Sequence, residues 1–384
     1  MKKIIFAGLG IIALCAVVLA CWALLALSHL PDVSKLKHYR PAAASEVLDR
    51  EGRLLTEFYD GRYRIWVPIA SLPDIVIQAV VIAEDDTFFE HKGVNYKAAW
   101  DALVLDVQRR RFARGGSTIT QQMIKNVLLT REKTLTRKLR EYILARRAEE
   151  VLTKRQILQI YLNEVEWGDN LYGIEAASRY YLDKHASELS PAEAALLAGM
   201  LPSPRYYNPF KRPDNARKRR DQVLFNMAQA KIITDDVYQA ALQTQPVLRQ
   251  QAAGRFTFTA LAAARASQCS DAVLEQILLR LFGDQNVYRG GWTIRTSLDR
   301  DLQGEMNRLE DAASEHSSAP DRVTVVRQGD QIRAILCSAG KETSVRDRLE
   351  SAGLPDLDYE VASVSPEAVT REQIILSVEG EKKK

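Results

Sequence analysis

The sequence predicts a mainly helical protein with one N-terminal transmembrane helix and a small α/β region at its C-terminal end. Three observations predict this fold class: an uncharged apolar run near the N-terminus, a long central stretch of capped helical segments, and strand-like runs after glycine turns in the last third. A length of 384 residues favours two or three domains. The apolar content of 46% and charged content of 27% are typical of a globular chain.

The first expected element is the transmembrane helix. Residues 4–27 are apolar and carry no charge, and about 20 such residues suffice to span a bilayer. Lys2 and Lys3 precede the run, so the positive-inside rule places residues 1–3 in the cytoplasm and the rest of the chain outside. A cleaved signal peptide is the alternative, but its apolar region would be shorter and no A-x-A cleavage site follows.

The next expected elements belong to a connector and a helical domain. Residues 28–45 contain two prolines and an alanine run, which indicates a connector. A helical domain is expected over residues 46–245, beginning with a short strand at residues 63–67. Within it, three Ser or Thr residues precede a Gln or Glu three positions later, which is the pattern of a helix capping box. These pairs are Thr118 with Gln121, Thr153 with Gln156, and Ser190 with Glu193.

The last expected region, residues 246–384, differs in composition. An alanine-rich helix is expected over residues 251–281, a strand after the glycine turn at 290–291, and a hairpin around Gly329. Cys269 and Cys337 would lie in an oxidising compartment, and whether they form a disulfide is left open. The five histidines form no cluster with metal-ligand spacing. The net charge of +4 gives no indication of a nucleic-acid partner, and none is expected.

An acidic pair follows an apolar segment. Residues 75–83 are apolar and predict a buried helix that delivers Glu84 and Asp85 to the edge of a cleft. A carboxylate near apolar groups has a raised pKa and becomes a usable base. An ordinary helix end with solvated acids is the alternative.

A glycine turn and a basic segment come next. Gly115 and Gly116 open a capped helix, whose free backbone N–H groups suit an anion. Gln121, Gln122, Lys125 and Asn126 follow at helical spacing. Arg137 and Glu141 are four residues apart and share a helix face, which indicates either an exposed ion pair or a second carboxylate held among cations near a phosphate.

Five ordered motifs over residues 46–245 resemble glycosyltransferase family 51, the peptidoglycan glycosyltransferases. These motifs are Glu84-Asp85-x-x-Phe88-x-x-His91-x-Gly93, Gly115-Gly116-Ser117-Thr118-x-Thr120-Gln121-Gln122, Arg137-Lys138-x-x-Glu141, Lys154-x-x-Ile157-Leu158-x-x-Tyr161-Leu162-Asn163 and Arg219-x-x-x-Val223-Leu224. Each motif alone is a hypothesis, whereas the five in order are specific.

The resemblance implies a lysozyme-like helical fold and polymerisation of lipid II by inverting transfer, with undecaprenyl pyrophosphate as leaving group. It implies that Glu84 is the catalytic base and that Glu141 is a second catalytic carboxylate near the pyrophosphate. It also implies a set of substrate-binding residues: Asp85, Phe88, His91, Ser117, Thr118, Gln121, Gln122, Lys125, Asn126, Lys133, Arg137 and Lys138. Lys133 stands where some members have Arg, which would weaken a bidentate phosphate contact.

The resemblance further implies the setting of the reaction. We expect the bacterial cytoplasmic membrane, with the catalytic domain on its outer side, and lipid II and the nascent glycan strand as partners. A divalent cation, Mg²⁺ or Mn²⁺, at Glu141 is left open, and no organic cofactor is expected. Transpeptidases and proteins of the division or elongation machinery are left open as partners. The length of the glycan product and the oligomeric state of the protein are also left open.

Residues 292–303 resemble the linker that begins a transpeptidase in class A penicillin-binding proteins. Ser338 and Lys341 match Ser-x-x-Lys, but no Ser-x-Asn or Lys-Thr-Gly partner follows. We therefore expect residues 246–384 to be an accessory or truncated module that penicillin does not acylate. Two other functions stay open: a lytic enzyme on the same scaffold, which would need a general acid, and a non-catalytic cell-wall scaffold.

Overall fold

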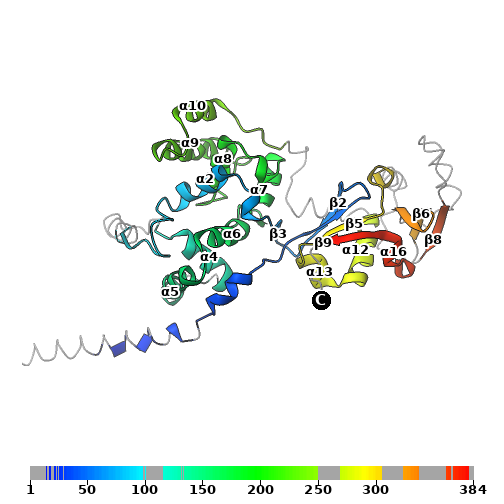
Figure 1. The fold of residues 1–384 in the computed structure, drawn as a ribbon, viewed down its shortest axis with the longest axis horizontal. Coiled ribbons are helices and arrows are strands. Elements are labelled where there is room, and N and C mark those ends of the chain that lie inside the picture. Colours follow the sequence, from blue (N-terminus) through cyan, green and yellow to red (C-terminus); the bar gives the residue numbers. More distant parts are fainter. Residues whose placement is uncertain are drawn as a thin grey trace, which may run out of the picture. The chain divides into compact units, whose positions relative to one another are not determined.

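The structure is a computed structural model. It describes residues 14, 17, 18, 21, 22, 24, 26–28, 30–97, 100, 116–130, 132, 134–249, 269–304, 323–336, 360–364 and 366–379. The chain divides into two compact units (Figure 1). The helical unit comprises residues 1–40, 67–168 and 172–249, and the α/β unit comprises residues 41–66, 169–171 and 250–384. Each unit is described by itself below.

The helical unit contains the central part of the chain. Its elements are η1 (Val33–His38), η2 (Ile69–Ser71), α2 (Asp74–Glu84), α4 (Ile119–Leu128), α5 (Leu135–Val151), α6 (Lys154–Glu164), α7 (Ile174–Leu182), η3 (Ala186–Glu188), α8 (Pro191–Met200), α9 (Pro213–Gln229) and α10 (Asp235–Gln243). This content confirms the prediction of a mainly helical domain, and α2 confirms the buried helix expected at residues 75–83.

Local capping explains where several of these helices begin. Thr118, Thr153 and Ser190 each accept a hydrogen bond from the backbone N–H three residues later. In return, the backbone N–H of each cap residue donates to the side-chain oxygen of the Gln or Glu at that position. All three predicted capping boxes are therefore confirmed. Such boxes satisfy backbone donors that the first helical turn leaves unpaired.

The helices pack in two groups. Helix α2 contacts α8 and α9, and α4 contacts α5 and α6. The packed faces are apolar, as in α2, where Val76, Val80 and Val81 are almost completely buried. This arrangement holds the C-terminal end of α2 and the first turn of α4 in fixed positions, because interior side chains are close-packed and resist shifts.

The predicted membrane span at residues 4–27 lies mostly outside the described residues. The residues described between 14 and 27 are helical. Across the described part of the chain, no helix has both the length and the apolar character needed to cross a membrane. At the end of this segment, the Ala26 carbonyl accepts a hydrogen bond of 2.6 Å from Arg140 Nε on α5.

Among the described residues, the α/β unit contains two sheets of three or more strands. The first has the order β2 (Leu54–Phe58), β1 (Ser45–Leu48), β5 (Thr293–Thr296) and β9 (Ile375–Glu379). Strands β1 and β5 are parallel, and the other neighbours are antiparallel. The second has the order β7 (Gln331–Leu336), β6 (Val323–Gln328) and β8 (Glu360–Val364), all antiparallel. Short β3 (Tyr63–Arg64) pairs with β4 (Leu171–Tyr172).

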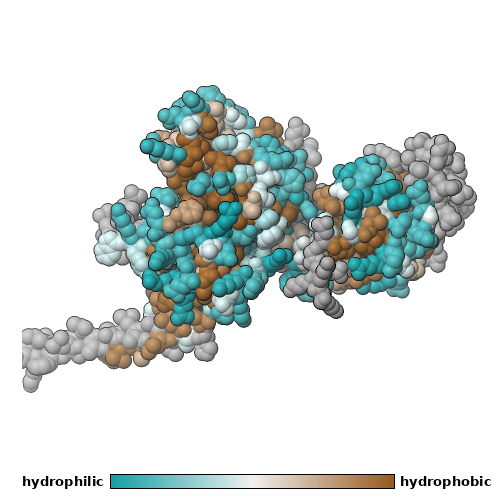
Figure 2. Space-filling model, in the orientation of Figure 1, coloured by the Kyte–Doolittle hydropathy of each residue, from teal (hydrophilic) through white to brown (hydrophobic). Residues whose placement is uncertain are grey.

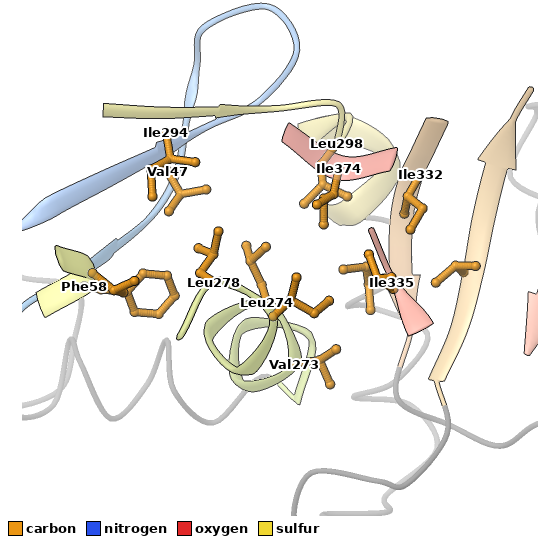
Figure 3. Close-up of a cluster of buried hydrophobic side chains, with 14 of the residues drawn as sticks. Val47, Phe58, Val273, Leu274, Leu278, Ile294, Leu298, Ile332, Ile335 and Ile374 are labelled. Atoms are coloured by element: carbon orange, nitrogen blue, oxygen red, sulfur yellow. The ribbon is translucent and has the colours of Figure 1, made fainter. Parts of the chain in front are cut away.

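A single apolar cluster holds the α/β unit together. Helix α12 (Cys269–Phe282) supplies Val273, Leu274 and Leu278, which belong to one buried cluster with Ile294 of β5 and Ile335 of β7 (Figure 3). The unit also contains α13 (Asp284–Arg289), η4 (Pro366–Ala368) and α16 (Arg371–Ile374). The predicted hairpin is confirmed, with Gly329 at φ 59° in its turn. Cys337 and Ser338 lie outside the described residues.

The structure divides the chain differently from the predicted boundaries of 46–245 and 246–384. Residues 41–66 belong to the α/β unit, because β1 hydrogen-bonds to β5, almost 250 residues later. The predicted strand at 63–67 is also shorter, since β3 ends at Arg64. Both units expose hydrophilic and hydrophobic residues on the face shown in Figure 2.

Candidate active site

Glu84 is the last residue of α2 and is mostly shielded from solvent. Its Oε2 accepts a hydrogen bond of 2.7 Å from Gln122 Nε2 on α4. Burial raises the pKa of Glu84, and the Gln122 hydrogen bond and the charges of Arg219 and Lys125 oppose this rise without cancelling it. A carboxylate whose pKa is raised by burial is suited to accept a proton near neutral pH.

The second carboxylate oxygen of Glu84 differs from the first. Oε1 is buried and has no hydrogen-bond partner among the described residues. An unsatisfied buried acceptor is costly, and such groups in a native structure call for an explanation. Oε1 therefore keeps its capacity to accept one more hydrogen bond.

Asp85 connects three parts of the site. Its carboxylate lies 3.0 Å from His91 Nε2 and accepts a 3.0 Å hydrogen bond from the backbone N–H of Ile119 at the start of α4. Asp85 is buried, and both contacts are within the protein. In the structure, Asp85 and His91 therefore fix the first turn of α4 next to the end of α2.

Two predicted binding residues, Thr118 and Gln121, form hydrogen bonds within the fold, whereas Nε2 of Gln121 is buried without a hydrogen-bond partner among the described residues. Both are buried and form the capping box of α4. Thr118 Oγ1 donates a 2.7 Å hydrogen bond to the Gly93 carbonyl. Gly93 has φ 86°, and a Cβ there would lie 2.6 Å from the Ala145 carbonyl of α5. Glycine at this position therefore allows the close approach of the two segments, and Thr118 secures it.

Phe88 is part of the segment from Asp85 to His91. It is fully buried, and the ammonium of Lys154 lies 4.3 Å from its ring centroid. Lys154 also donates to the His91 carbonyl at 2.6 Å and pairs with Glu149 at 2.7 Å. Phe88 thus supports the 85–91 segment through packing.

Gln122 is held from two sides. Its Nε2 donates to Glu84, and its Oε1 accepts a 3.3 Å hydrogen bond from the hydroxyl of Tyr161 on α6. Tyr161 is fully buried. Burial raises its pKa well above the ordinary value, and the negative charges of Glu84 and Asp85 add to the rise, so the hydroxyl keeps its proton.

Glu141 lies among cations in the middle of α5. Its Oε2 pairs with Arg137 Nη1 at 2.7 Å, and its Oε1 pairs with Lys138 Nζ. Lys138 Nζ also donates a 2.7 Å hydrogen bond to Ser117 Oγ before α4. The predicted pairing of Arg137 with Glu141 is confirmed, and the carboxylate is buried, not a solvated surface acid.

Lys125 connects the two carboxylates electrostatically. Much of its side chain is exposed, but its ammonium is partly removed from water, which lowers the pKa of Lys125, and Glu141 opposes this effect. Arg137 and Lys138 lower the pKa further, and Glu84 raises it. Asn126, one residue later, is exposed. Lys133 lies outside the described residues.

The residues around Glu141 do not by themselves fit a divalent cation. Both of its oxygens are engaged by Arg137 and Lys138, and the neighbouring positive charges oppose a further cation. Across the described ranges, no group of three or more His, Cys, Asp or Glu side chains gathers with metal-site spacing. This donor set is instead suited to a ligand with several negative charges.

The structure adds residues that the predicted site omitted. The positive charge of Arg219 on α9 lowers the pKa of Glu84. The Nε atom of Arg219 is buried without a hydrogen-bond partner in the described part of the chain. Its guanidinium carbon lies 5.9 Å from the ring centroid of Tyr207. Arg219 and Tyr161 both lie in quoted motifs, so the motifs were the available signal, but their distance from Glu84 depends on helix packing.

Comparison with known proteins agrees with the motif resemblance. Residues 51–228 match the family model described as transglycosylase. Penicillin-binding protein 1A of Aquifex aeolicus is 36% identical over 305 residues, which cover 79% of this chain and 40% of the relative. Penicillin-binding protein 1A of Rickettsia prowazekii is 36% identical over 280 residues, which cover 72% of this chain and 35% of the relative.

A solved structure is also similar. The crystal structure of penicillin-binding protein 1A from Haemophilus influenzae matches with a TM-score of 0.36 and 20% identity, over 81% of this chain and 35% of that chain. The chain spans 40% or less of the length of these relatives.

Proposed function

Because residues 51–228 belong to the transglycosylase family, glycosyltransferase family 51, we propose that this chain is a peptidoglycan glycosyltransferase. It polymerises lipid II into glycan strands with undecaprenyl pyrophosphate as leaving group. The proposal includes a lysozyme-like fold for the helical unit. Its main support is that two shielded carboxylates occupy opposite surroundings, Glu84 with a free oxygen and a raised pKa and Glu141 paired with two cations.

Glu84 acts as the catalytic base in this proposal. The 4-hydroxyl of the acceptor sugar gives its proton to the free Oε1 of Glu84 while the hydroxyl oxygen attacks the anomeric carbon of the donor. The bond from that carbon to the pyrophosphate breaks on the opposite side, and the pyrophosphate leaves with the electron pair. The raised pKa of Glu84 supports this role, because a base works best when its pKa is close to the working pH.

The cations near Glu141 bind the leaving group in this proposal. Pyrophosphate gains negative charge as it departs, and fixed positive groups stabilise that charge. Lys125, Arg137 and Lys138 form one electrostatically connected cluster, and Glu141 holds two of them in place through its paired oxygens. This cluster also supports a transferase over a lytic enzyme, which makes no demand for pyrophosphate contacts.

The proposal extends to location and partners. The uncharged run at residues 4–27 supports a single membrane span with the catalytic domain on the outer side of the cytoplasmic membrane. Lipid II and the nascent strand are the substrates. A reporter fused after residue 245 is expected to be active only outside the cytoplasm, and activity of a cytoplasm-only reporter there would contradict this topology.

The direct experiment supplies purified full-length protein with lipid II and separates the products by length on a gel. We expect glycan strands from the wild type and none from Glu84→Gln. Shortening of preformed glycan by the wild type would instead support the lytic alternative. The absence of both reactions would support the non-catalytic scaffold.

A further inference from the structure

A hydrogen-bonded chain of three side chains crosses the helical unit and ends on the proposed base. It begins at the Tyr161 hydroxyl on α6, passes through the Gln122 amide on α4 and ends at Glu84 Oε2 on α2, with distances of 3.3 and 2.7 Å. Tyr161 lies almost 80 residues from Glu84 in the sequence and has no role in the chemistry proposed above. Its hydroxyl nevertheless donates to Gln122, the side chain that hydrogen-bonds to the proposed base.

The hydrogen bonds from Tyr161 to Glu84 all donate in one direction, because the two ends of this hydrogen-bonded chain differ chemically. A carboxylate only accepts hydrogen bonds, so Gln122 must present its NH₂ group to Glu84. The amide oxygen then points away from Glu84 and needs a donor, and the Tyr161 hydroxyl is the donor at that place. If the amide were turned over, its oxygen would face a carboxylate oxygen, and the two acceptors would repel each other.

We propose that Tyr161 is a positioning residue that acts through Gln122: it fixes the orientation of the Gln122 amide, which holds Oε2 of Glu84 and leaves Oε1 free for the acceptor hydroxyl. The inference rests on the proposed function for the identity of that hydroxyl, but the geometry of the chain does not depend on it. The burial of Tyr161 and of Glu84 Oε1 supports the inference, since buried polar groups depend on hydrogen bonds within the protein for their orientation.

Other charged groups also act on Glu84 and must be kept unchanged in a test. These are Arg219 of α9, Lys125 of α4 and the neighbouring Asp85. None of them is altered when the Tyr161 hydroxyl is removed. The Gln122 hydrogen bond lowers the pKa of Glu84 against the effect of burial, so a loosened Gln122 raises that pKa further.

The test replaces Tyr161 by Phe and measures two quantities. The first is the rate of lipid II polymerisation against pH, which is expected to fall about threefold to tenfold at neutral pH, the usual worth of one hydrogen bond. Its acid limb is expected to move to higher pH, because the base must be ionised. The second is the titration of Glu84 by carboxyl-¹³C NMR, assigned by comparison with Glu84→Gln, which is expected to show the same upward shift of the pKa.

The matched control is Tyr181→Phe. Tyr181 is also fully buried in the helical unit, and its hydroxyl donates 3.0 Å to the Trp167 carbonyl, so this variant loses a buried tyrosine hydroxyl without touching Gln122. Tyr181→Phe is expected to leave the acid limb and the Glu84 titration in place. Melting temperatures of both variants measure any general loss of stability.

A second pair of variants tests whether Tyr161 acts through Gln122. Gln122→Met keeps the volume but removes the amide and is expected to raise the pKa of Glu84 by itself. Adding Tyr161→Phe to Gln122→Met is then expected to cause no further shift, since interacting residues are not additive. Equal shifts from Tyr161→Phe in both backgrounds, or an unchanged Glu84 titration in Tyr161→Phe, would overturn the inference. The NMR titration decides this even if the wild type does not polymerise lipid II, which is the outcome that would overturn the proposed function.

Discussion

Glu84 at the end of α2 and Glu141 in the middle of α5 are both shielded from solvent, but their oxygens have different partners. Glu84 receives one hydrogen bond from a neutral amide, and its other oxygen is free of partners among the described residues. Glu141 has a cation on each oxygen. These surroundings support the two roles proposed above, proton acceptance by Glu84 and the holding of cations by Glu141.

The difference originates in the sequence around each residue. Glu84 follows an apolar helix that provides no cation of its own, so burial dominates and raises its pKa. Glu141 follows Arg137 and Lys138 by four and three residues, which places both cations on its helix face. The residues next to each carboxylate in the sequence therefore distinguish the two proposed roles. Each role can be tested by neutralising one carboxylate at a time.

The largest effect is expected from Glu84→Gln. The amide keeps the shape of the side chain but cannot accept the proton, so polymerisation is expected to fall by about 10²–10⁴-fold. Affinity for a donor analogue is expected to change little, because Arg137 and Lys138 are held by Glu141 and not by Glu84. Turnover and analogue binding measured side by side check this, and near-normal polymerisation would contradict the base assignment.

A smaller loss is expected from Glu141→Gln, and of a different kind. Arg137 and Lys138 lose their anionic partner, and a charge-assisted hydrogen bond is worth about 1.5–3 kcal/mol, so activity is expected to fall about 10–100-fold. Donor-analogue affinity is expected to fall as well, in contrast to Glu84→Gln. If the two variants lost activity without any difference in analogue binding, the two carboxylates would not have the separate roles described here.

Lys125→Gln is expected to have a still smaller effect that involves both carboxylates. Lys125 lowers the pKa of Glu84, so its removal is expected to move the acid limb of the pH–rate profile upward. The rate at neutral pH is expected to fall only about threefold to tenfold, because the Lys125 ammonium is only partly removed from water and solvent still screens its charge. Lys218→Gln, at an exposed position of α9, is the matched control, and an identical profile for both variants would show that Lys125 is an ordinary surface lysine.

The smallest expected effect is on stability. A carboxyl group whose pKa is raised by folding stabilises the fold when protonated, and this contribution is lost as the pH rises through the raised pKa. Glu84→Gln is therefore expected to be about 0.5–2 kcal/mol more stable than the wild type at neutral pH. The two proteins are expected to converge at low pH, where Glu84 is protonated. Denaturant unfolding at two pH values measures this, and a less stable variant at neutral pH would contradict it.

The parts of the molecule that depend on neighbours in the sequence could be predicted. The three capping boxes and the Arg137–Glu141 pair need only residues three or four positions apart, and all are confirmed. The family was predictable as well, because five short motifs in order carry much information. The substrate-binding role that the resemblance implies for Asp85, Thr118 and Gln121 stays a prediction; in the structure Asp85, Thr118 and Oε1 of Gln121 form hydrogen bonds within the protein.

The parts that depend on distant residues could not be predicted. Strand β1 pairs with β5 across almost 250 residues, and four residues of alternating burial are too few to identify a strand or its partner. The contact of Tyr161 with Gln122 and the action of Arg219 on Glu84 likewise arise from the packing of α6 and α9. Periodicity assigns residues to a helix face but does not say which faces meet.

The most direct measurement for the central claim is the titration of the Glu84 carboxyl carbon by NMR in the wild-type protein, with Glu84→Gln to identify the signal. The free Oε1 and the burial of the side chain predict a pKa above the ordinary glutamate range, with the acid limb of the polymerisation rate at the same pH. A pKa at or below the ordinary range, or a rate that does not follow the titration, would contradict the assignment of Glu84 as the base.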